Sequence, residues 1–443
     1  MRDTAHNDVK RVRGRDHFKT PTFARFPRCF MGAVFILLLF AGHSGALFAE
    51  SFDSIKDGQR KKFDGVKPRG NDFDKLLGPR DALLIADSRG RVLWSKNADK
   101  TLVPASTLKL LTSLAALHYL GPGYRFSTEF YLDRNSNLKI KGYGDPLLIS
   151  EVLADIAGVL RKKISTYNDL ILDDSYFAGP LTIPGITSSD QPYDAPNGAL
   201  CVNFNTIFFE REKGFPVSAE PQTPLLPFAL KRIGKSSRGQ GRIPLSRKND
   251  ESLLYAGHLF RYFLDRHGIT SGGMIKTGEV NPATDQLVYR YVSRFSLEEN
   301  IAKLLEHSNN FMANQLLIAT GAKVGGPPGT LDKGVQTMAN FSKNVLKINQ
   351  IKMVEGSGIS RKNRISVQGM HKVLDAFAPF RHLLRTRDGF QYKSGTLHHV
   401  STAAGYFEGG NKELYRIVVL LNSPGKSARQ VMEKATSRLN LGR

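Results

Sequence analysis

Cysteine is nearly absent from this chain, and its scarcity limits how the fold can be stabilised. The 443 residues include two cysteines, Cys29 and Cys201. Cys29 lies in a basic and apolar leader, and no lipobox-like pattern precedes it. Removal of that leader would leave Cys201 alone, which excludes an internal disulfide in the mature protein. We therefore expect the hydrophobic core to hold the fold together.

The N-terminal region also lacks a hydrophobic run long enough to span a membrane. The apolar run at residues 30–41 has about 12 residues, whereas a stable membrane-spanning helix needs roughly 20. It follows a basic stretch and precedes small residues at 44–46 and at Ala49. This order is typical of a secretory signal peptide. We predict that residues 1–49 are a signal peptide and that the protein is exported to the periplasm or cell envelope; an uncleaved anchor is the alternative.

Acidic residues are scarce relative to basic ones. The chain has 63 Lys and Arg against 40 Asp and Glu, a net charge of +23. Residues 1–49 hold eight Lys/Arg and three Asp, so their removal leaves about +18. Such a surface favours anionic partners. Export, and the lack of zinc-finger spacing or an aromatic-basic RNA motif, argue against nucleic acid. An anionic envelope surface is the partner that the charge favours.

Motifs for metal, phosphate and histidine-dependent chemistry are missing. The chain has no His-Glu-x-x-His, no P-loop and no Gly-x-Ser-x-Gly elbow. His398 and His399 are adjacent on a predicted strand, where successive side chains point to opposite faces and cannot hold one metal ion. We therefore expect no metal site, no cofactor and no hydrolase of the Ser-His-Asp kind.

The chain does contain three short motifs in order: Ser106-Thr107-Leu108-Lys109, Ser308-Asn309-Asn310 and Lys393-Ser394-Gly395. The first opens a predicted helix at 106–120 that is apolar on all sides and therefore buried. Gly121-Pro122-Gly123 ends this helix. A spacing of three residues on a helix places Lys109 beside the Ser106 hydroxyl. Because burial lowers the pKa of a lysine, Lys109 can act as the neutral base that activates the serine.

The second and third motifs can supply other parts of an acyl-transfer site. Ser308 and Asn310 lie at a polar break after a predicted helix at 297–307. A hydroxyl there can relay a proton to a leaving amine, and an amide can orient the lysine and a substrate carbonyl. Lys393 and Ser394 can hold a substrate carboxylate.

The backbone around Gly395 can complete this site. Gly395 lets the strand approach an acyl group closely, and the N–H groups of Thr396 and Ser106 can form an oxyanion hole. The same spacings recur elsewhere, so the order and the flanks of the motifs carry the inference. The copies are Ser136…Lys139, Ser423…Lys426, Ser342-Lys343-Asn344 and Lys276-Thr277-Gly278.

Hydrophobic patterning predicts an α/β frame at the two ends of the chain. A hairpin is predicted at 82–94, and a helix begins at Ser296 with Glu299 as its capping-box partner. Strand-like runs at 390–408 and 413–422 predict a long hairpin. A closing helix is predicted at 426–439. We assign residues 50–124 and 284–443 to this catalytic domain.

The middle of the chain, residues 125–283, has a different character. Short strand-like segments alternate with Pro- and Gly-rich loops, which predicts a β-rich insert between the first and second motifs. The elements expected there are strands at 126–132, 170–172 and 199–209, an amphipathic helix at 253–267 and an exposed mobile loop at 233–248.

The flanks of the motifs resemble D-alanyl-D-alanine carboxypeptidases/endopeptidases of the class C penicillin-binding type. The resemblance runs from about residue 80 to 425. The segments that carry it are Pro104–Lys109, Gly142-Tyr143-Gly144-Asp145-Pro146, Asp173-Asp174-Ser175-Tyr176-Phe177, Tyr193-Asp194-Ala195-Pro196, Glu355–Arg361 and Lys393–Leu397. It implies a transpeptidase/β-lactamase-like domain, an antiparallel sheet flanked by helices, with a large insert.

The resemblance also implies residue roles. Ser106 would be the acylated nucleophile and Lys109 its base, Ser308 and Asn310 would complete the proton relay, and Lys393 and Ser394 would hold the substrate carboxylate. The chain departs from the family pattern at four positions, where its activity is expected to differ. These are Asn309, where an acidic residue is commoner, Asn314 where glutamate is expected, Tyr143 in place of glycine, and Glu355 in place of aspartate.

These observations predict an exported serine D,D-peptidase that acts on peptidoglycan stem peptides and that penicillins acylate. A β-lactamase is the first alternative; it is disfavoured because no glutamate lies between Asn310 and Glu355 to drive deacylation as in class A enzymes. A catalytically weak wall-binding relative is the second, and intact Ser106, Lys109 and Lys393 argue against it.

Overall fold

The computed structural model describes residues 73–236, 238–246, 248–410 and 412–440. The predicted signal peptide at 1–49 lies outside this part of the chain. Within the described part, no helix combines the length and the hydrophobicity needed to cross a bilayer.

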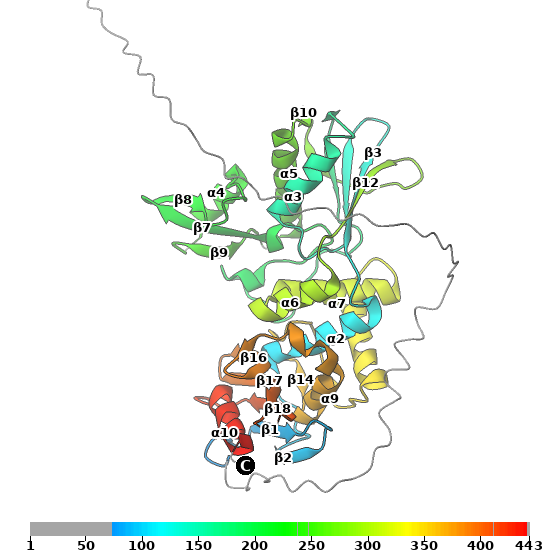
Figure 1. Cartoon of the computed structure of the whole chain (residues 1–443). Coiled ribbons are helices and arrows are strands. Elements are labelled where there is room, and N and C mark those ends of the chain that lie inside the picture. Colours follow the sequence, from blue (N-terminus) through cyan, green and yellow to red (C-terminus); the bar gives the residue numbers. More distant parts are fainter. Residues whose placement is uncertain (1–72, 237, 247, 411, 441–443) are drawn as a thin grey trace, which may run out of the picture. The chain divides into compact units, whose positions relative to one another are not determined.

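The largest sheet is antiparallel throughout and has six strands in the order β15-β16-β17-β18-β1-β2 (Figure 1). It joins the two ends of the described chain, because β1 pairs with β18. The predicted hairpin at 82–94 forms β1 and β2. The bounds are β1 Asp81–Ala86, β2 Val92–Lys96, β15 Thr386–Arg387, β16 Phe390–Leu397, β17 Val400–Glu408 and β18 Leu414–Leu421.

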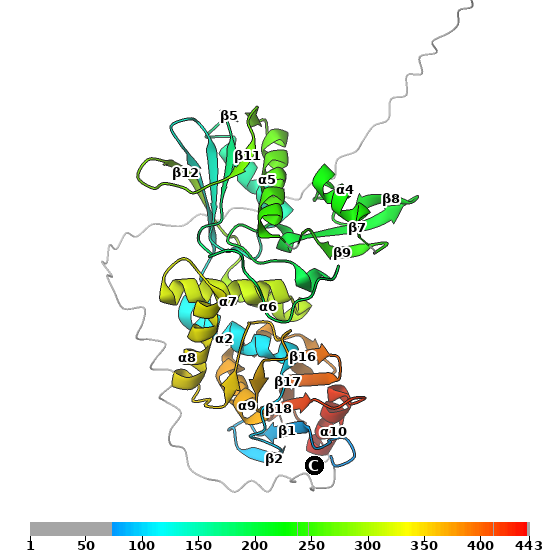
Figure 2. The same ribbon diagram turned by 180° about the vertical axis from the view of Figure 1, so that it is seen from behind.

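Helices cover both faces of this sheet, and the alternation of side chains along β1 explains how. Leu83 and Ile85 pack in one core with α10 (Ala428–Asn440), whereas Ala82 and Leu84 pack in another with α2 (Leu108–Leu120) and α9 (Val367–Phe377). The strand is buried along its whole length. Figure 2 shows the sheet between α10 and α9. The predicted flanked antiparallel sheet is therefore present.

Helix α2 is buried as its all-round apolar pattern predicts. Ten of its residues, from Leu108 to Leu117, are buried, and the helix ends at Gly121. It packs against α7 (Asn310–Gly325), α6 (Leu297–His307) and α9. The capping box of α6 forms as predicted, with the Ser296 side chain and Glu299 exchanging hydrogen bonds. Helix α8 (Leu331–Asn340) lies against α7, and a short hairpin pairs β13 (Ile351–Lys352) with β14 (Arg364–Ile365).

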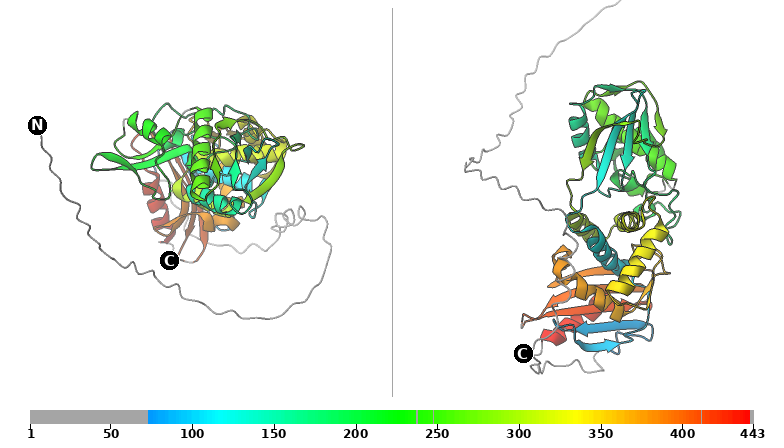
Figure 3. Two further views of the ribbon diagram at one scale, coloured as in Figure 1. Left: turned by 90° about the horizontal axis from the view of Figure 1, so that it is seen from above. Right: turned by 90° about the vertical axis from the view of Figure 1, so that its right-hand side faces the viewer.

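A second sheet of five strands lies in the inserted segment, in the order β11-β6-β4-β3-β12. Helices α3 (Ser150–Leu160) and α5 (Asn249–Arg266) pack in its core. Figure 3 shows these strands and helices from the side and from above. The strands are β3 Ser127–Leu132, β4 Leu138–Gly142, β6 Leu170–Asp173, β11 Ile275–Thr277 and β12 Gln286–Val292, and a separate pair joins β5 (Thr166–Tyr167) to β10 (Thr270–Ser271).

Strand β12 lies beyond residue 283, where we expected the insert to end, yet it pairs with β3 along its whole length. We propose that the insert extends through Val292. The pairing of β12 with β3 and the packing of Val288, Tyr289 and Tyr291 in the insert's core support this boundary.

A small third sheet, in the order β8-β7-β9, corrects two expectations for the insert. The segment 233–248 is not a loop: it holds the end of α4 (Pro227–Gly234) and β9 (Gly241–Pro244), because Ile233 and Ile243 are buried in the insert's core. The run at 199–209 is only partly a strand, since residues 203–205 have positive φ angles. Strand β7 covers Thr206–Glu212 and β8 covers Phe215–Ser218.

The run at 390–408 is two strands and not one. Strands β16 and β17 form a tight hairpin in which Leu397 pairs with Val400, so His398 and His399 are its two turn residues. The expectation that these histidines lie on a strand and point apart is wrong. A turn reverses the chain within two residues, and the two rings lie 3.6 Å apart between their centroids.

Candidate active site

Ser106 lies in a tight turn immediately before α2. Residues Ala105–Thr107 form a 3-10 turn, and Ala105 adopts a left-handed φ of 47°. Two hydroxyl groups donate to the carbonyl of Pro104: Thr107 Oγ1 at 2.7 Å and Thr402 Oγ1 of β17 at 2.8 Å. The turn is thereby held at both the helix and the sheet. A left-handed residue other than glycine costs about 1 kcal/mol or more, so the surrounding packing must impose this conformation.

Lys109 is fully buried behind Ser106. Its Nζ lies 3.0 Å from Ser106 Oγ, 2.7 Å from Asn310 Oδ1 and 2.7 Å from the carbonyl oxygen of Ser357. A neutral amine has two N–H donors and one lone pair. The amide and carbonyl oxygens can take both donors, which leaves the lone pair for the Ser106 hydroxyl. The prediction that the first and second motifs meet at this lysine agrees with the observed contacts.

The electrostatic surroundings of Lys109 favour its neutral form. Burial lowers its pKa well below that of an ordinary lysine, the positive charge of Lys393 lowers it further, and the carboxylate of Glu355 partly opposes both. Removing an ammonium group from water is costly. A larger fraction of Lys109 is therefore unprotonated near neutral pH than for a lysine in water.

The second motif lies at the junction of α6 and α7. Ser308 ends α6 with a left-handed φ of 52°, and Asn310 is the first residue of α7. The Asn309 side chain caps α7 by accepting from the backbone N–H of Met312 at 3.1 Å. An acidic residue could accept the same bond, so Asn309 keeps the local geometry. Ser308 lines a cavity with Ser106, although these two described residues share no direct hydrogen bond.

The third motif lies on β16 beside the Ser106 turn. Lys393 is 5% exposed and its Nζ donates to the carbonyl of Ser394 at 2.9 Å. Burial lowers the pKa of Lys393 to about 8. The Ser394 side chain is exposed, as strand alternation requires when its neighbour is buried. The motif therefore presents a buried ammonium and an exposed hydroxyl from opposite faces of one strand.

Gly395 permits a close approach between β16 and the nucleophile turn. A Cβ atom at this position would lie 2.6 Å from the backbone nitrogen of Ser106 and 3.0 Å from Ala105 Cβ. The first distance is shorter than a Cβ contact can be, and the second is tighter than most, so a side chain here would force β16 or the turn to move. The glycine is thus needed for contact with the protein's own Ser106 turn, a requirement that spacing in the sequence did not reveal.

One edge of β16 is open beside Ser106. Strand β15 pairs only with Phe390 and Gln391, so among the described residues the edge from Lys393 onward has no strand partner on that side. The tight turn makes Leu397 and Val400 a hydrogen-bonded pair, and such pairs alternate along an antiparallel ladder. The backbone N–H of Thr396 accordingly points to the open edge.

A loop at 355–360 supports the site from behind, and sequence reasoning did not identify its role. The Glu355 carboxylate accepts from the backbone N–H groups of Ser357 and Gly358 at 2.6 and 2.8 Å and from Asn363 Nδ2 at 2.6 Å. Gly358 has a φ of 83°, and a Cβ there would overlap the carbonyl oxygen of Ala105. Glu355 thus shapes the loop that carries the carbonyl bound by Lys109. The sequence of segment 355–361 resembles the family pattern, but it did not predict that the Ser357 carbonyl of this segment contacts Lys109.

The two other departures from the family pattern also have structural roles. Asn314 Oδ1 accepts from the backbone N–H of Gly356 at 2.7 Å, which ties α7 to the 355–360 loop. Tyr143 lies in the insert and donates its hydroxyl to Glu129 Oε2 at 2.6 Å, as does Tyr131. Arg290 of β12 also pairs with Glu129. Tyr143 therefore closes a hydrogen-bond network within the five-stranded sheet.

Two cavities meet at Ser106. One of about 800 Å³ extends toward Phe204 and Ser308, and one of about 710 Å³ extends toward Arg361 and Thr396. Ser106, Tyr193 and Asn310 line both. A substrate bound at the nucleophile therefore has space on each side of the reacting carbonyl.

The chance copies of the motifs lie away from this site. Lys139 pairs with Asp285 at 2.8 Å, Lys276 pairs with Asp169, and Ser342 donates to a helix carbonyl. In the part of the chain that the structure describes, no group of three or more His, Cys, Asp or Glu side chains could hold a metal ion.

Comparison with known proteins agrees with this geometry. The D-alanyl-D-alanine carboxypeptidase of Actinomadura sp. (strain R39) is 25% identical over 442 aligned residues, which cover 82% of this chain and 82% of that protein. The D-alanyl-D-alanine carboxypeptidase DacB of Haemophilus influenzae is 22% identical over 333 residues, with 66% of this chain and 69% of that protein covered. The crystal structure of penicillin binding protein 4 from H. influenzae has a TM-score of 0.66 at 18% identity and covers 84% of this chain and 97% of that chain.

A family model covers most of the chain. The model of the D-Ala-D-Ala carboxypeptidase 3 (S13) family matches residues 71–233 and 230–386, which include the first two motifs and end before Lys393. The likeness in fold to penicillin binding protein 4 confirms the predicted fold class. The family match confirms the resemblance inferred from the motifs: the chain belongs to the D-Ala-D-Ala carboxypeptidase 3 (S13) family.

Proposed function

We propose that this protein is a serine D,D-peptidase that removes the terminal D-alanine of peptidoglycan stem peptides through an acyl-enzyme on Ser106. The same site would cut D-alanyl crosslinks. The observation that carries the proposal is the 3.0 Å contact between the Ser106 hydroxyl and the buried Lys109 amine, because a serine becomes nucleophilic when a neutral base takes its proton.

Acylation begins when Ser106 Oγ attacks the carbonyl carbon of the penultimate residue and its proton passes to Lys109 Nζ. The backbone N–H groups of Ser106 and Thr396 stabilise the oxyanion that forms. The C–N bond then breaks, and the proton on Lys109 reaches the leaving amine through the hydroxyl of Ser308. Asn310 holds Lys109 in place through its Oδ1 atom.

Deacylation reverses these proton movements with water as the nucleophile. Lys109 takes a proton from the water as it attacks the ester carbonyl, and the proton returns to Ser106 Oγ as the ester bond breaks. The ammonium of Lys393 holds the substrate's terminal carboxylate during acylation; the Ser394 hydroxyl lies on the opposite face of β16 and is not given this role in the proposal.

A β-lactam presents a strained amide and a carboxylate to the same groups, so we propose that penicillins acylate Ser106. The purified mature protein, mixed with a fluorescent penicillin, is expected to form a long-lived covalent adduct that a Ser106→Ala variant does not form. Rapid turnover of the adduct would identify a β-lactamase instead. Complete lack of labelling in the wild-type protein would contradict both enzymes, and release of D-alanine from a soluble peptide is the parallel measurement.

The acylation rate is expected to rise and then fall with pH. Lys109 acts as a base only when neutral, and burial and the charge of Lys393 lower its pKa, so the rise begins below the range of an ordinary lysine. Lys393 holds a carboxylate only when protonated, and burial lowers its pKa to about 8, so substrate binding weakens as the pH passes that value. A plot of kcat/KM against pH reports the free enzyme and should be bell-shaped. A Lys393→Ala variant should lose the alkaline limb; persistence of that limb would refute its assignment to Lys393.

We also propose that the protein is exported to the cell envelope. The leader at 1–49 and the wall-directed chemistry of the site support this location.

A further inference from the structure

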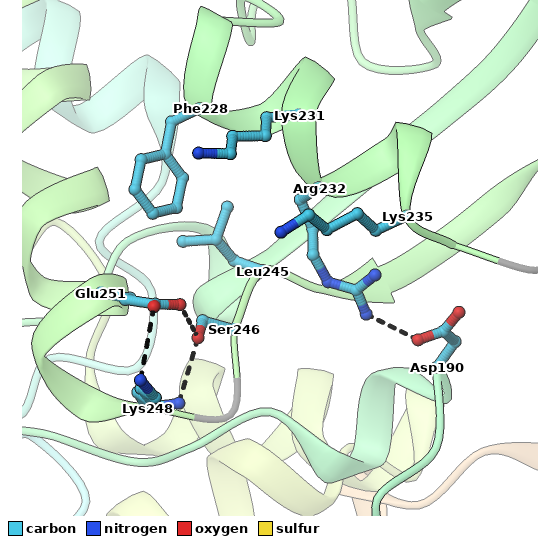
Figure 4. A pocket seen from close by; sticks show the side chains of 9 residues that line it. All are labelled: Asp190, Phe228, Lys231, Arg232, Lys235, Leu245, Ser246, Lys248 and Glu251. Carbon is cyan, nitrogen blue, oxygen red and sulfur yellow. Dashed lines mark hydrogen bonds and ion pairs between the residues drawn. The ribbon is translucent and has the colours of Figure 1, made fainter.

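A basic pocket lies in the insert, apart from the site at Ser106. It has a volume of about 470 Å³ and is formed where α4, β9 and α5 meet (Figure 4). The residues that line it are Asp190, Phe228, Lys231, Arg232, Lys235, Leu245, Ser246, Lys248 and Glu251.

The charges in this pocket do not balance. Arg232 pairs with Asp190 at 2.6 Å, and Lys248 lies 3.9 Å from Glu251. Both carboxylates are therefore engaged by other cations. Lys231 and Lys235 are exposed and have no acidic partner among the described residues. Lys231 lies in the last turn of α4 and Lys235 is its C-cap residue, so the end of this helix offers the pocket two uncompensated ammonium groups.

The remaining walls of the pocket are mixed. Phe228 and Leu245 supply the apolar side chains of the lining (Figure 4). Ser246 and Glu251 are joined by a hydrogen bond and supply oxygen atoms to the lining. A ligand that carries carboxylates, amide N–H groups and aliphatic carbon would match all of these surfaces.

A single loop connects this pocket to the cavities at Ser106. Asp190 accepts from Arg232 at 2.6 Å and from Ser236 Oγ at 2.7 Å, which fixes the loop to α4. Three residues further on, Tyr193 lines both cavities beside Ser106. A polymer that enters the cavity beside Tyr193 therefore has the basic pocket three residues away along the same loop.

We propose that the basic pocket is a second substrate-binding site, which takes a carboxylate-bearing peptide strand of the same wall polymer whose ends react at Ser106. The inference rests on the proposed function. Lys231 and Lys235 pair with the carboxylates, and Phe228 and Leu245 contact the aliphatic parts of the strand. Binding at two points of one polymer raises the effective concentration of its peptide ends at the nucleophile.

The mixed lining favours a peptide over a phosphodiester polymer. Phosphate groups would satisfy the lysines but would offer no N–H donor to Glu251 or Ser246 and little apolar surface to Phe228. A peptide strand supplies all three kinds of contact. Binding to phosphate-bearing polymer alone is therefore the competing outcome.

The test measures binding separately from catalysis. Full-length protein carrying Ser106→Ala is sedimented with insoluble peptidoglycan from which phosphate-bearing polymers have been removed, at low and at high salt. Adding Lys231→Gln and Lys235→Gln should weaken binding about tenfold, since each exposed ion pair contributes up to about 1 kcal/mol, and should reduce the salt dependence. With Ser106 intact, the same double variant should cleave a short soluble D-Ala-D-Ala peptide at the unchanged rate.

The matched control is Lys162→Gln with Lys163→Gln, which removes the same charge from two exposed lysines elsewhere in the insert. This control should bind like its parent, and Lys231→Arg with Lys235→Arg should restore binding. If the Lys231/Lys235 variant and the Lys162/Lys163 variant lose equal amounts of binding, net charge alone explains the effect and the proposal is overturned. Loss seen only with phosphate-bearing wall would also overturn it. Failure of the wild-type protein to release D-alanine would refute the proposed function while leaving the binding result intact.

Discussion

Replacing Lys109 with methionine is expected to slow acylation of Ser106 by about a thousandfold, because general-base catalysis typically contributes 10²–10⁴-fold. The lysine is fully buried and its Nζ contacts Ser106 Oγ, Asn310 Oδ1 and the Ser357 carbonyl. Methionine has a similar length and fills the same space, but it has no lone pair basic enough to take the serine proton. The measurement is the rate of covalent labelling by a fluorescent penicillin under single-turnover conditions.

The stability of this variant is a separate question with opposing contributions. Burial lowers the pKa of Lys109 in the folded protein, so below the pKa of an unfolded lysine the unfolded chain binds the proton more readily than the folded chain does. This difference lowers the free energy of unfolding at neutral pH. Removing it relieves that penalty at neutral pH. The Asn310 and Ser357 oxygens, however, lose a donor, which costs roughly 1–3 kcal/mol for a buried group. Thermal unfolding and near-UV circular dichroism should therefore show a folded protein.

The matched control for Lys109→Met is Lys393→Met, which removes the second buried lysine of the site. We expect it to weaken substrate and penicillin binding and to leave the chemical step less affected, because the role proposed for Lys393 is to hold the carboxylate and not to take the Ser106 proton. Its removal also takes away a charge that lowers the pKa of Lys109, so the rising limb of the pH profile should move to higher pH. Acylation of Lys109→Met at the wild-type rate would contradict the role of lysine as base.

Gly395→Ala is expected to reduce acylation by about a hundredfold or more while the protein stays folded. The new methyl group would lie 2.6 Å from the backbone nitrogen of Ser106, so either β16 or the nucleophile turn must move. That nitrogen is one of the two proposed oxyanion donors, and loss of one such donor typically costs 10²–10³-fold in rate. Single-turnover labelling and D-alanine release measure the effect.

A glycine with free space around it provides the control. Gly123 follows α2, and a Cβ built there meets no atom within 4 Å. Gly123→Ala should therefore change neither the labelling rate nor the melting temperature appreciably. Overpacking of a core position costs typically 1–3 kcal/mol, so the melting temperature of Gly395→Ala is expected to fall by only a few degrees. Labelling of Gly395→Ala at the wild-type rate would show that β16 does not need to approach Ser106 this closely.

The elements that sequence alone predicted correctly are those whose pattern is local. The all-round apolar run of α2, the capping box of Ser296 and Glu299, and the hairpin of β1 and β2 each depend on residues a few positions apart. The same is true of the spacing that brings Ser106 beside Lys109. Local free-energy preferences are enough to specify such features.

The elements that sequence misjudged depend on partners far along the chain. Strand β12 pairs with β3, more than 150 residues earlier, and its Tyr289 and Tyr291 pack in the insert's core, which is why we propose that it belongs to the insert. Strand β9 lies in a basic stretch that resembles a loop, and the insert's core buries its Ile243. The turn at His398 and His399 contains no residue type that is typical of turns, and it became apparent only from the pairing of β16 with β17.

By itself the sequence determined the chemistry of the site: a serine, a lysine three residues later, and two further motifs in an order that matches one family. Tertiary structure decided the geometry that this chemistry requires. It brought Asn310 and the Ser357 carbonyl to Lys109 across more than 200 residues of chain, and it made Gly395 and Gly358 necessary by packing their backbones against the Ser106 turn. The physical reason is that close packing and desolvation exist only when distant segments meet, so the lowered pKa of Lys109 is a property of the folded core and not of its motif.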